Sequence, residues 1–170
     1  FGTVIGADLS SDALRFVHDA RPTTTPVQAS LTDLPFRDAA FDVTLATTVL
    51  YTVPDDNAAV HELARTLTPG GALLIVEPAF AALRRAHDAV VHGKRRYRTG
   101  TLAAMLVRHG MRIEHTTYAK SFLAPPAFAL GALERVRRNA PKKSDLESHG
   151  VDSAVDPAFR KLAEAEDRWI

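Results

Sequence analysis

The sequence predicts an α/β fold of three layers, in which helices cover a mostly parallel sheet. Short apolar runs alternate with segments of helical periodicity through most of the first 120 of the 170 residues. The run 72–76 is apolar without interruption, as expected for a strand that is covered on both faces. An acid, Asp8, directly follows the first apolar run and precedes the start of a helix. Together these observations favour a Rossmann-like arrangement.

The first elements are a strand, a helix and a second strand. The apolar run 3–7 predicts the first strand, and Ser10 or Ser11 is suitably placed to cap a helix over about 11–19. A turn rich in proline and threonine ends this helix. Residues 27–29 then predict a second, short strand.

A strand, an amphipathic helix and a further strand come next. Residues 41–45 predict a strand that continues toward Thr47, and a helix follows the segment 54–56. The buried stripe of this helix consists of Val60, Leu63, Ala64 and Leu67. The turn at 69–71, which holds a proline and two glycines, ends the helix and leads into the strand 72–76.

The pattern then becomes more helical. One helix is expected over about 80–91, and another from Thr99 or Thr101 to Gly110. The alternation over 111–118 predicts a further strand.

We predict that the chain divides into an α/β part, residues 1–120, and a helical part, residues 121–170. Two helices are expected in the second part, one from Pro125 to about 138 and one from Asp156 to the end. The polar, turn-rich segment 139–155 between them is predicted to be a mobile linker.

Composition argues against several classes of protein. The formal net charge of +1 gives no electrostatic reason to expect binding to nucleic acid or to an anionic membrane. No apolar run approaches the roughly 18 residues of a membrane span. The absence of cysteine excludes disulfides, thiolate metal sites and a cysteine nucleophile. We therefore expect a cytoplasmic protein without nucleic acid or membrane as partner.

Five motifs occur in the order and near the spacing of a known family. They are VIGADLS at 4–10, DLPF at 33–36 with FDV at 41–43, VLYTVPD at 49–55, LARTLTPGG at 63–71 and LIVEP at 74–78. Over about 1–118 the chain thereby resembles the class I S-adenosylmethionine (SAM)-dependent methyltransferases, in particular the small-molecule enzymes with a minimal domain. The resemblance implies SAM as cofactor and methyl transfer to a small organic acceptor. It makes residues 1–120 a partial SAM-binding domain and 121–170 a segment that covers the substrate.

Asp8 is the main candidate for cofactor binding. Ligands of open α/β sheets bind outside the carboxyl ends of the strands, where an acid accepts hydrogen bonds from ribose hydroxyls. The resemblance implies this role for Asp8, with Leu9 packing beside the adenine. A carboxylate that merely caps the following helix is the alternative interpretation of Asp8.

Four further residues match cofactor positions of the family. Ser30 and Leu31 lie in the turn that reads the adenine edge, and the family commonly has an aspartate where this chain has Ser30. An ordinary turn is the alternative there. Ala46 and Thr47 match positions that line the methionine side of the cofactor.

The catalytic residues stay unassigned. Much of the catalysis of methyl transfer comes from holding donor and acceptor in line, and a histidine could take a proton from the acceptor. None of the seven histidines occupies a position that the family fixes, and His61 is expected to face solvent. We expect no metal, because paired acids such as Asp55 and Asp56 usually complement a helix dipole. The basic stretch 94–98 is interpreted as a solvated loop at the edge of the substrate cleft.

The family's first strand, its glycine-rich loop and its last strand have no counterpart in the chain. Because the first strand lies at the centre of the family sheet, its loss should leave two half-sheets with unpaired edges. We therefore expect an N-terminally truncated fragment that is inactive alone. Two other functions stay open: an NAD(P)-dependent oxidoreductase, whose cofactor ribose an acid also binds, and a non-catalytic remnant. The acceptor and the oligomeric state do not follow from the sequence.

Overall fold

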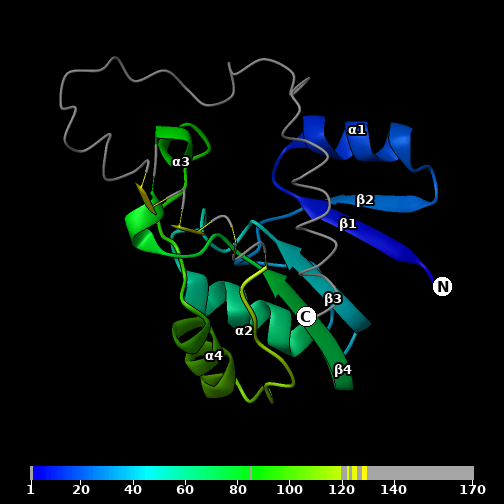
Figure 1. The fold of residues 1–170 in the computed structure, drawn as a ribbon. Helices are drawn as coiled ribbons and strands as arrows, with labels where there is room; N and C mark the ends of the chain where they lie inside the picture. Colours follow the sequence, from blue (N-terminus) through cyan, green and yellow to red (C-terminus); the bar gives the residue numbers. More distant parts are fainter. Residues whose placement is uncertain (1, 85, 120–121, 123, 126–127, 130–170) are drawn as a thin grey trace. The chain divides into compact units, whose positions relative to one another are not determined.

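The computed structural model describes residues 2–84, 86–119, 122, 124–125 and 128–129 (Figure 1). The chain forms two compact units. The first consists of Phe1–Val76 with His109–Met111, and the second of Glu77–Arg108 with Arg112–Ile170. The predicted helices from Pro125 and Asp156 and the predicted linker lie almost wholly outside the described residues.

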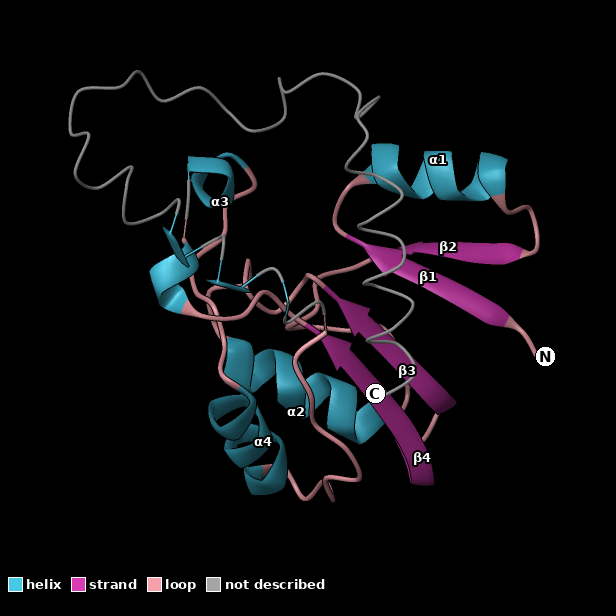
Figure 2. Ribbon diagram, in the orientation of Figure 1, coloured by secondary structure: helices cyan, strands magenta, loops and turns pink. Residues whose placement is uncertain are grey.

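The first parallel strand pair of unit 1 is built from β1 (Val4–Asp8) and β2 (Thr24–Gln28). Helix α1 (Ser11–Ala20) connects them and lies along one face of the pair (Figure 2). Its start is fixed by the predicted cap, because the Ser10 hydroxyl accepts a hydrogen bond from the backbone N–H of Ala13 at 3.2 Å.

Strand β2 lies earlier in the chain than the predicted 27–29. It begins at Thr24, includes Pro26 and ends at Gln28. The sequence pattern assigns proline to a turn, but a strand with a free edge tolerates a residue that has no N–H to donate. The proline therefore did not stop the strand, and the predicted boundary was wrong.

The second parallel pair consists of β3 (Phe41–Thr47) and β4 (Leu67–Val76), joined by helix α2 (Asp56–Thr66). The Asp55 carboxylate caps α2 by accepting from the Ala58 N–H at 3.0 Å. Asp56 lies in the first turn of the helix, so these acids serve the helix start, as predicted.

The turn predicted at 69–71 is a bulge within β4. Phe41 pairs with Leu67 and Val43 with Ala72, so that the single residue Asp42 faces four residues of β4, 68–71. Leu67, predicted as the last residue of the buried helix stripe, is instead the first residue of this strand. The glycines allow the bulge, and Gly70 has a φ of 82°.

Helix α2 carries four of the buried residues of unit 1. Val60 and Leu63 of the predicted stripe are buried, together with Ala59 and Thr66. The loop before α2 adds Leu50, Tyr51 and Val53 to this core. Burial of these apolar side chains is the main favourable term in folding this unit.

The four strands form two separate parallel pairs, β1–β2 and β3–β4. This confirms the prediction of two half-sheets. Each of the four described strands therefore has one edge without a partner strand. On β3, Val43 is 69% exposed and Leu45 is 63% exposed.

Unit 2 differs from the prediction in two places. Residues 80–91 do not form one helix but a 3₁₀ turn, η1 (Ala81–Leu83), and a short helix, α3 (Ala86–Val90). The helix pattern is interrupted because Phe80 has a φ of 58° and Arg84 is extended with a ψ of 130°. The strand predicted over 111–118 is also wrong, since these residues pair with no described strand.

Helix α4 (Thr99–Arg108) agrees with its prediction. Met105 is buried, and Gly110 follows the helix with a φ of 81°, the left-handed conformation that commonly ends helices. None of the helices within the described ranges is long and apolar enough to cross a membrane.

Candidate functional site

Asp8 lies at the carboxyl end of β1, directly opposite Gln28 at the end of β2. Its carbonyl oxygen accepts from the N–H of Ala29 at 3.0 Å. Its side-chain Oδ1 accepts from the N–H of Ser10 at 2.7 Å. The carboxylate therefore has a fixed orientation at the helix start, and the residue remains exposed to solvent. The capping role left open for Asp8 is real, but it occupies only one carboxylate oxygen.

Leu9 forms the turn between β1 and α1. The Gln28 side chain donates from Nε2 to the Leu9 carbonyl oxygen at 2.9 Å, and this bond ties the turn to the neighbouring strand. The Leu9 side chain is 66% exposed. An apolar side chain held beside an oriented carboxylate offers a contact for an apolar ring next to a hydrogen-bonding group. Gln28 belongs to no sequence motif, and its position opposite Asp8 follows only once the two strands are paired.

The turn after β2 is closed by its own hydrogen bonds. The Asp33 N–H donates to the Ser30 carbonyl oxygen at 3.0 Å. The Ser30 hydroxyl lies 2.8 Å from the Thr32 hydroxyl and accepts from the Thr32 N–H at 3.3 Å. The Ser30 side chain therefore stabilises the turn itself. Leu31, at the tip, is half-buried.

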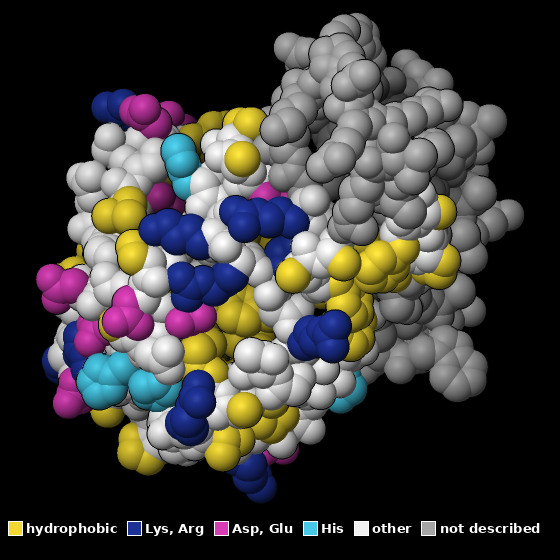
Figure 3. Space-filling model, turned by 90° about the vertical axis from the view of Figure 1, so that its left-hand side faces the viewer, with side chains coloured by type: hydrophobic (Ala, Val, Ile, Leu, Met, Phe, Trp, Pro, Cys, Tyr) yellow, Lys and Arg dark blue, Asp and Glu magenta, His cyan; other side chains and the backbone are white. Residues whose placement is uncertain are grey.

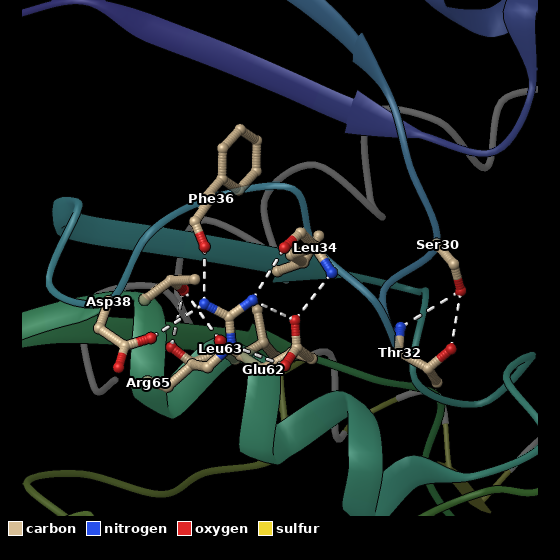
Figure 4. A network of polar contacts seen from close by, with 9 residues as sticks. Ser30, Thr32, Leu34, Phe36, Asp38, Glu62, Leu63 and Arg65 are labelled. Carbon is tan, nitrogen blue, oxygen red and sulfur yellow. Dashed lines mark hydrogen bonds and ion pairs between the residues drawn. The ribbon is translucent and has the colours of Figure 1, made fainter.

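Glu62 and Arg65 of α2 hold the segment that follows this turn (Figure 4). The Glu62 carboxylate accepts from the Leu34 N–H at 2.7 Å, and Arg65 donates to the Leu34 carbonyl oxygen at 2.8 Å. Arg65 also donates to the Phe36 carbonyl oxygen at 2.6 Å and pairs with the Asp38 carboxylate at 3.1 Å. Sequence reasoning assigned no role to either charge, although their i, i+3 spacing on a helix was a visible signal.

The charges of this pair shift each other's titration. The Arg65 guanidinium holds the pKa of Glu62 below its ordinary value, and the Leu34 N–H adds to this effect, while partial burial opposes it. The carboxylates of Glu62 and Asp38 raise the pKa of Arg65 in turn. Both groups are therefore charged at neutral pH.

Ala46 and Thr47 end β3 at the carboxyl edge of the second pair, where Thr47 lies opposite Val76. Ala46 is buried, whereas Thr47 is exposed. The next residue, Thr48, donates its N–H to the Val76 carbonyl oxygen at 2.7 Å with a φ of 50°. The structure thus places the six predicted residues at the carboxyl ends of their strands or in the turns that follow.

Unit 2 carries an aromatic cluster of Phe80, Tyr118 and Phe128. The rings of Phe80 and Tyr118 are stacked with centroids 4.8 Å apart, and Phe128 lies 5.9 Å from Phe80. The Tyr118 hydroxyl oxygen accepts from the Thr99 N–H at 3.1 Å at the start of α4. It also lies 3.3 Å from the Thr99 hydroxyl. These bonds lower the pKa of Tyr118.

The remaining polar candidates behave as structural or solvated groups. His61 is exposed, as predicted, with its ring 6.1 Å from that of His109. The basic segment 94–98 was predicted to be a solvated loop, and for part of it this is wrong. Tyr97 is buried, and Arg96 forms a two-point ion pair with the buried Asp88 at 3.0 Å. Lys94 is exposed, and Figure 3 shows further Lys and Arg side chains on the surface. No group of three potential metal ligands comes together within the described part of the chain.

Comparison with known proteins agrees with this geometry. Residues 1–75 match the sequence profile of the family described as "Methyltransferase domain". A curated relative, the ubiquinone/menaquinone biosynthesis C-methyltransferase UbiE of Vibrio vulnificus, is 34% identical over 97 residues. This part of the chain is therefore similar to a methyltransferase domain. This alignment covers 52% of the chain but only 37% of the UbiE enzyme, so the chain spans little more than a third of that relative.

Solved structures show the same methyltransferase fold. The [4+2]-cyclase SpnF has a TM-score of 0.62 and 21% identity, with 96% of this chain and 58% of SpnF covered. Phosphoethanolamine N-methyltransferase 2 of Haemonchus contortus, solved in complex with SAM, has a TM-score of 0.58 and 17% identity. That alignment covers 98% of this chain and 40% of the enzyme. The predicted Rossmann-like fold is therefore confirmed.

Proposed function

We propose that the protein containing this chain is a SAM-dependent methyltransferase that acts on a small organic acceptor. The observation that carries the proposal is the oriented, exposed carboxylate of Asp8 at the carboxyl end of β1. It occupies the position at which an acid binds a nucleotide ribose in open α/β sheets. The match of residues 1–75 to a methyltransferase domain supports SAM as the nucleotide.

The residues present fit the adenosine part of SAM. Asp8 has a second carboxylate oxygen for a ribose hydroxyl, since the bond to the Ser10 N–H uses Oδ1. Leu9 presents an exposed apolar side chain for the purine ring. Ser30 and Leu31 would meet the adenine edge through the backbone of their turn, because the Ser30 hydroxyl is already bonded to Thr32. We assign Ala46 and Thr47 to the methionine side.

When bound, SAM supplies an electrophilic methyl group on its sulfonium. The residues named here bind and orient the adenosine, which helps to hold donor and acceptor in line. The described residues suggest no general base, and the proposal needs none for an acceptor that is already nucleophilic. Holding the donor in place is thus the chemical contribution that we assign to this chain.

The small acceptor is inferred from the relatives. UbiE enzymes are named for quinone biosynthesis, and the Haemonchus contortus enzyme for phosphoethanolamine. The cyclase SpnF shares the fold, so the fold alone does not fix the reaction. The sequence match to methyltransferases therefore carries more weight here than the structural likeness. A cytoplasmic location stays a prediction.

Calorimetric titration of the complete gene product tests the proposal. We expect binding of S-adenosylhomocysteine and no heat with NAD⁺ or NADP⁺. Binding of a nicotinamide cofactor instead would favour the oxidoreductase, and the absence of all nucleotide binding would favour the non-catalytic remnant. Incubation with labelled SAM and an extract of small molecules from the host then identifies the acceptor. The same assay on residues 1–170 alone tests the expectation that this chain is inactive by itself.

A further inference from the structure

A single ion pair on α2 binds both backbone groups of Leu34. Glu62 accepts from the Leu34 N–H at 2.7 Å, while Arg65 donates to the Leu34 carbonyl oxygen at 2.8 Å. The two side chains thus take the part that a neighbouring strand would play for this residue (Figure 4). Leu34 itself is buried.

The pair is a rigid support. Arg65 contacts Glu62 at two points, from Nε to Oε1 at 2.7 Å and from Nη2 to Oε2 at 2.6 Å. The Arg65 side chain is 24% exposed and that of Glu62 is 12% exposed. Their helix is fixed by two buried residues, Leu63, which follows Glu62, and Thr66, which follows Arg65. Such fork-like pairing fixes direction as well as distance.

This support holds one end of the turn that we assign to the adenine edge. At the first end, the Ala29 N–H donates to the carbonyl oxygen of Asp8. At the other end, the turn closes at Asp33, and the next residue is Leu34. Between these two attachments lie Ser30 and Leu31. Their backbone position therefore depends on β1 at one end and on the Glu62–Arg65 pair at the other.

We propose that Glu62 and Arg65 are positioning residues that set the selectivity of this turn for adenine over other purines. The inference rests on the proposed function. Hydrogen bonds discriminate between ligands only when the protein groups are held in place. If the pair is weakened, the turn gains freedom and reads the edge of the base less strictly. The ribose contact of Asp8 belongs to β1 and does not depend on the pair.

The test compares S-adenosylhomocysteine with S-inosylhomocysteine, in which a carbonyl group replaces the adenine amino group. The full-length protein should prefer the adenine compound, and Arg65→Lys should reduce this preference by about tenfold. Lysine keeps the charge but cannot reach the carbonyl oxygens of Leu34 and Phe36 together. Glu62→Gln should reduce the preference less, because its amide oxygen still accepts from the Leu34 N–H.

Two control variants separate positioning from other effects. Arg15→Lys alters an arginine on α1 that pairs with Asp12 on the surface, and it should leave both affinities unchanged. Asp8→Asn should lower the affinity for both compounds by the same factor and so preserve the preference for the adenine compound. A wild-type protein that binds neither compound would refute the proposed function. If the wild type prefers S-adenosylhomocysteine and both α2 variants keep the full preference, only the positioning role of Glu62 and Arg65 would be overturned.

Native-state hydrogen exchange provides a measurement without ligand. The amides of Asp33 and Leu34 should exchange faster in Arg65→Lys and, to a smaller extent, in Glu62→Gln, while the amides in the first turn of α2 should be unaffected. Unchanged exchange at Leu34 would contradict the positioning role. Failure of both variants to fold would also overturn it, because the pair would then be a general stability element.

Discussion

Gln28 of β2 donates from its side chain to the carbonyl oxygen of Leu9, at 2.9 Å, across the carboxyl end of the first strand pair. The bond joins the turn that carries Leu9 to the strand that leads into the adenine turn. Asp8 lies opposite Gln28 in the register. The two predicted cofactor segments of the first pair are thus linked by a residue outside all five sequence motifs.

Gln28→Glu should weaken the binding of S-adenosylhomocysteine. The new carboxylate cannot donate to the Leu9 carbonyl, and it places a second negative charge at the strand end beside Asp8. We expect a loss of about tenfold, the usual effect of one lost hydrogen bond with added repulsion. Calorimetric titration measures it. Thr25→Glu puts the same charge at an exposed position on the same strand and should bind as wild type. Equal affinities for the two variants would argue against a role for Gln28.

Acidification should weaken unit 1 through Glu62. Because the folded pKa of this carboxyl lies below its ordinary value, its stabilisation is complete above the ordinary pKa and is lost as the pH falls through the folded pKa. The free energy of unfolding should therefore decrease below about pH 4. In Glu62→Gln this decrease should be smaller. Urea unfolding at several pH values checks the slope, and identical slopes for wild type and variant would exclude the Arg65 contact as the cause.

Gly71→Ala should destabilise unit 1 by about 1–3 kcal/mol. A Cβ atom at this position would lie 2.9 Å from the Thr68 carbonyl oxygen and 3.0 Å from that of Asp42. Both atoms belong to the backbone of the bulge and cannot move aside easily. Gly100→Ala is the control, because nothing lies within 4 Å of its Cβ position and alanine favours the helix. Thermal unfolding measures both variants. A neutral Gly71→Ala would mean that the bulge is not as tight as described.

The phenol of Tyr118 should ionise at a lower pH than an ordinary tyrosine. Hydrogen bonds from the Thr99 hydroxyl and the Thr99 N–H stabilise the phenolate and so lower its pKa. Thr99→Val removes the hydroxyl and should raise the pKa toward its ordinary value. Ultraviolet titration of the phenolate follows the change, and Tyr118→Phe identifies which of the three tyrosines is responsible. If Tyr118 ionises at the same pH in Thr99→Val as in the wild type, the hydrogen bond between the Thr99 and Tyr118 hydroxyls would be contradicted.

Local patterns predicted the elements of unit 1 well. Apolar runs located β1 and β3, and the Ser10 cap located the start of α1. These signals depend on residues within a few positions of one another. The boundary between α2 and β4 was misplaced because Leu67 continues the helical period although its backbone is extended.

Contacts between distant residues could not be predicted. Leu34 and Glu62 are 28 positions apart and meet only because α2 packs beside the loop. The interrupted helix after Phe80 depends on backbone conformations at Phe80 and Arg84 that no periodicity reveals. In the candidate site, Asp8 was predicted from its strand end, whereas its support by Gln28 required the strand register.

The central claim is that the carboxylate of Asp8 binds the ribose of SAM, and calorimetric titration of full-length Asp8→Asn with S-adenosylhomocysteine tests it most directly. Asparagine keeps the shape and the bond to the Ser10 N–H but removes the charge. We predict a loss of affinity of roughly 30-fold, since hydrogen bonds to a charged group contribute about 1.5–3 kcal/mol. Asp12→Asn, a change at an exposed acid of α1, should bind as wild type. An Asp8→Asn protein that is folded and binds as tightly as wild type would contradict the account.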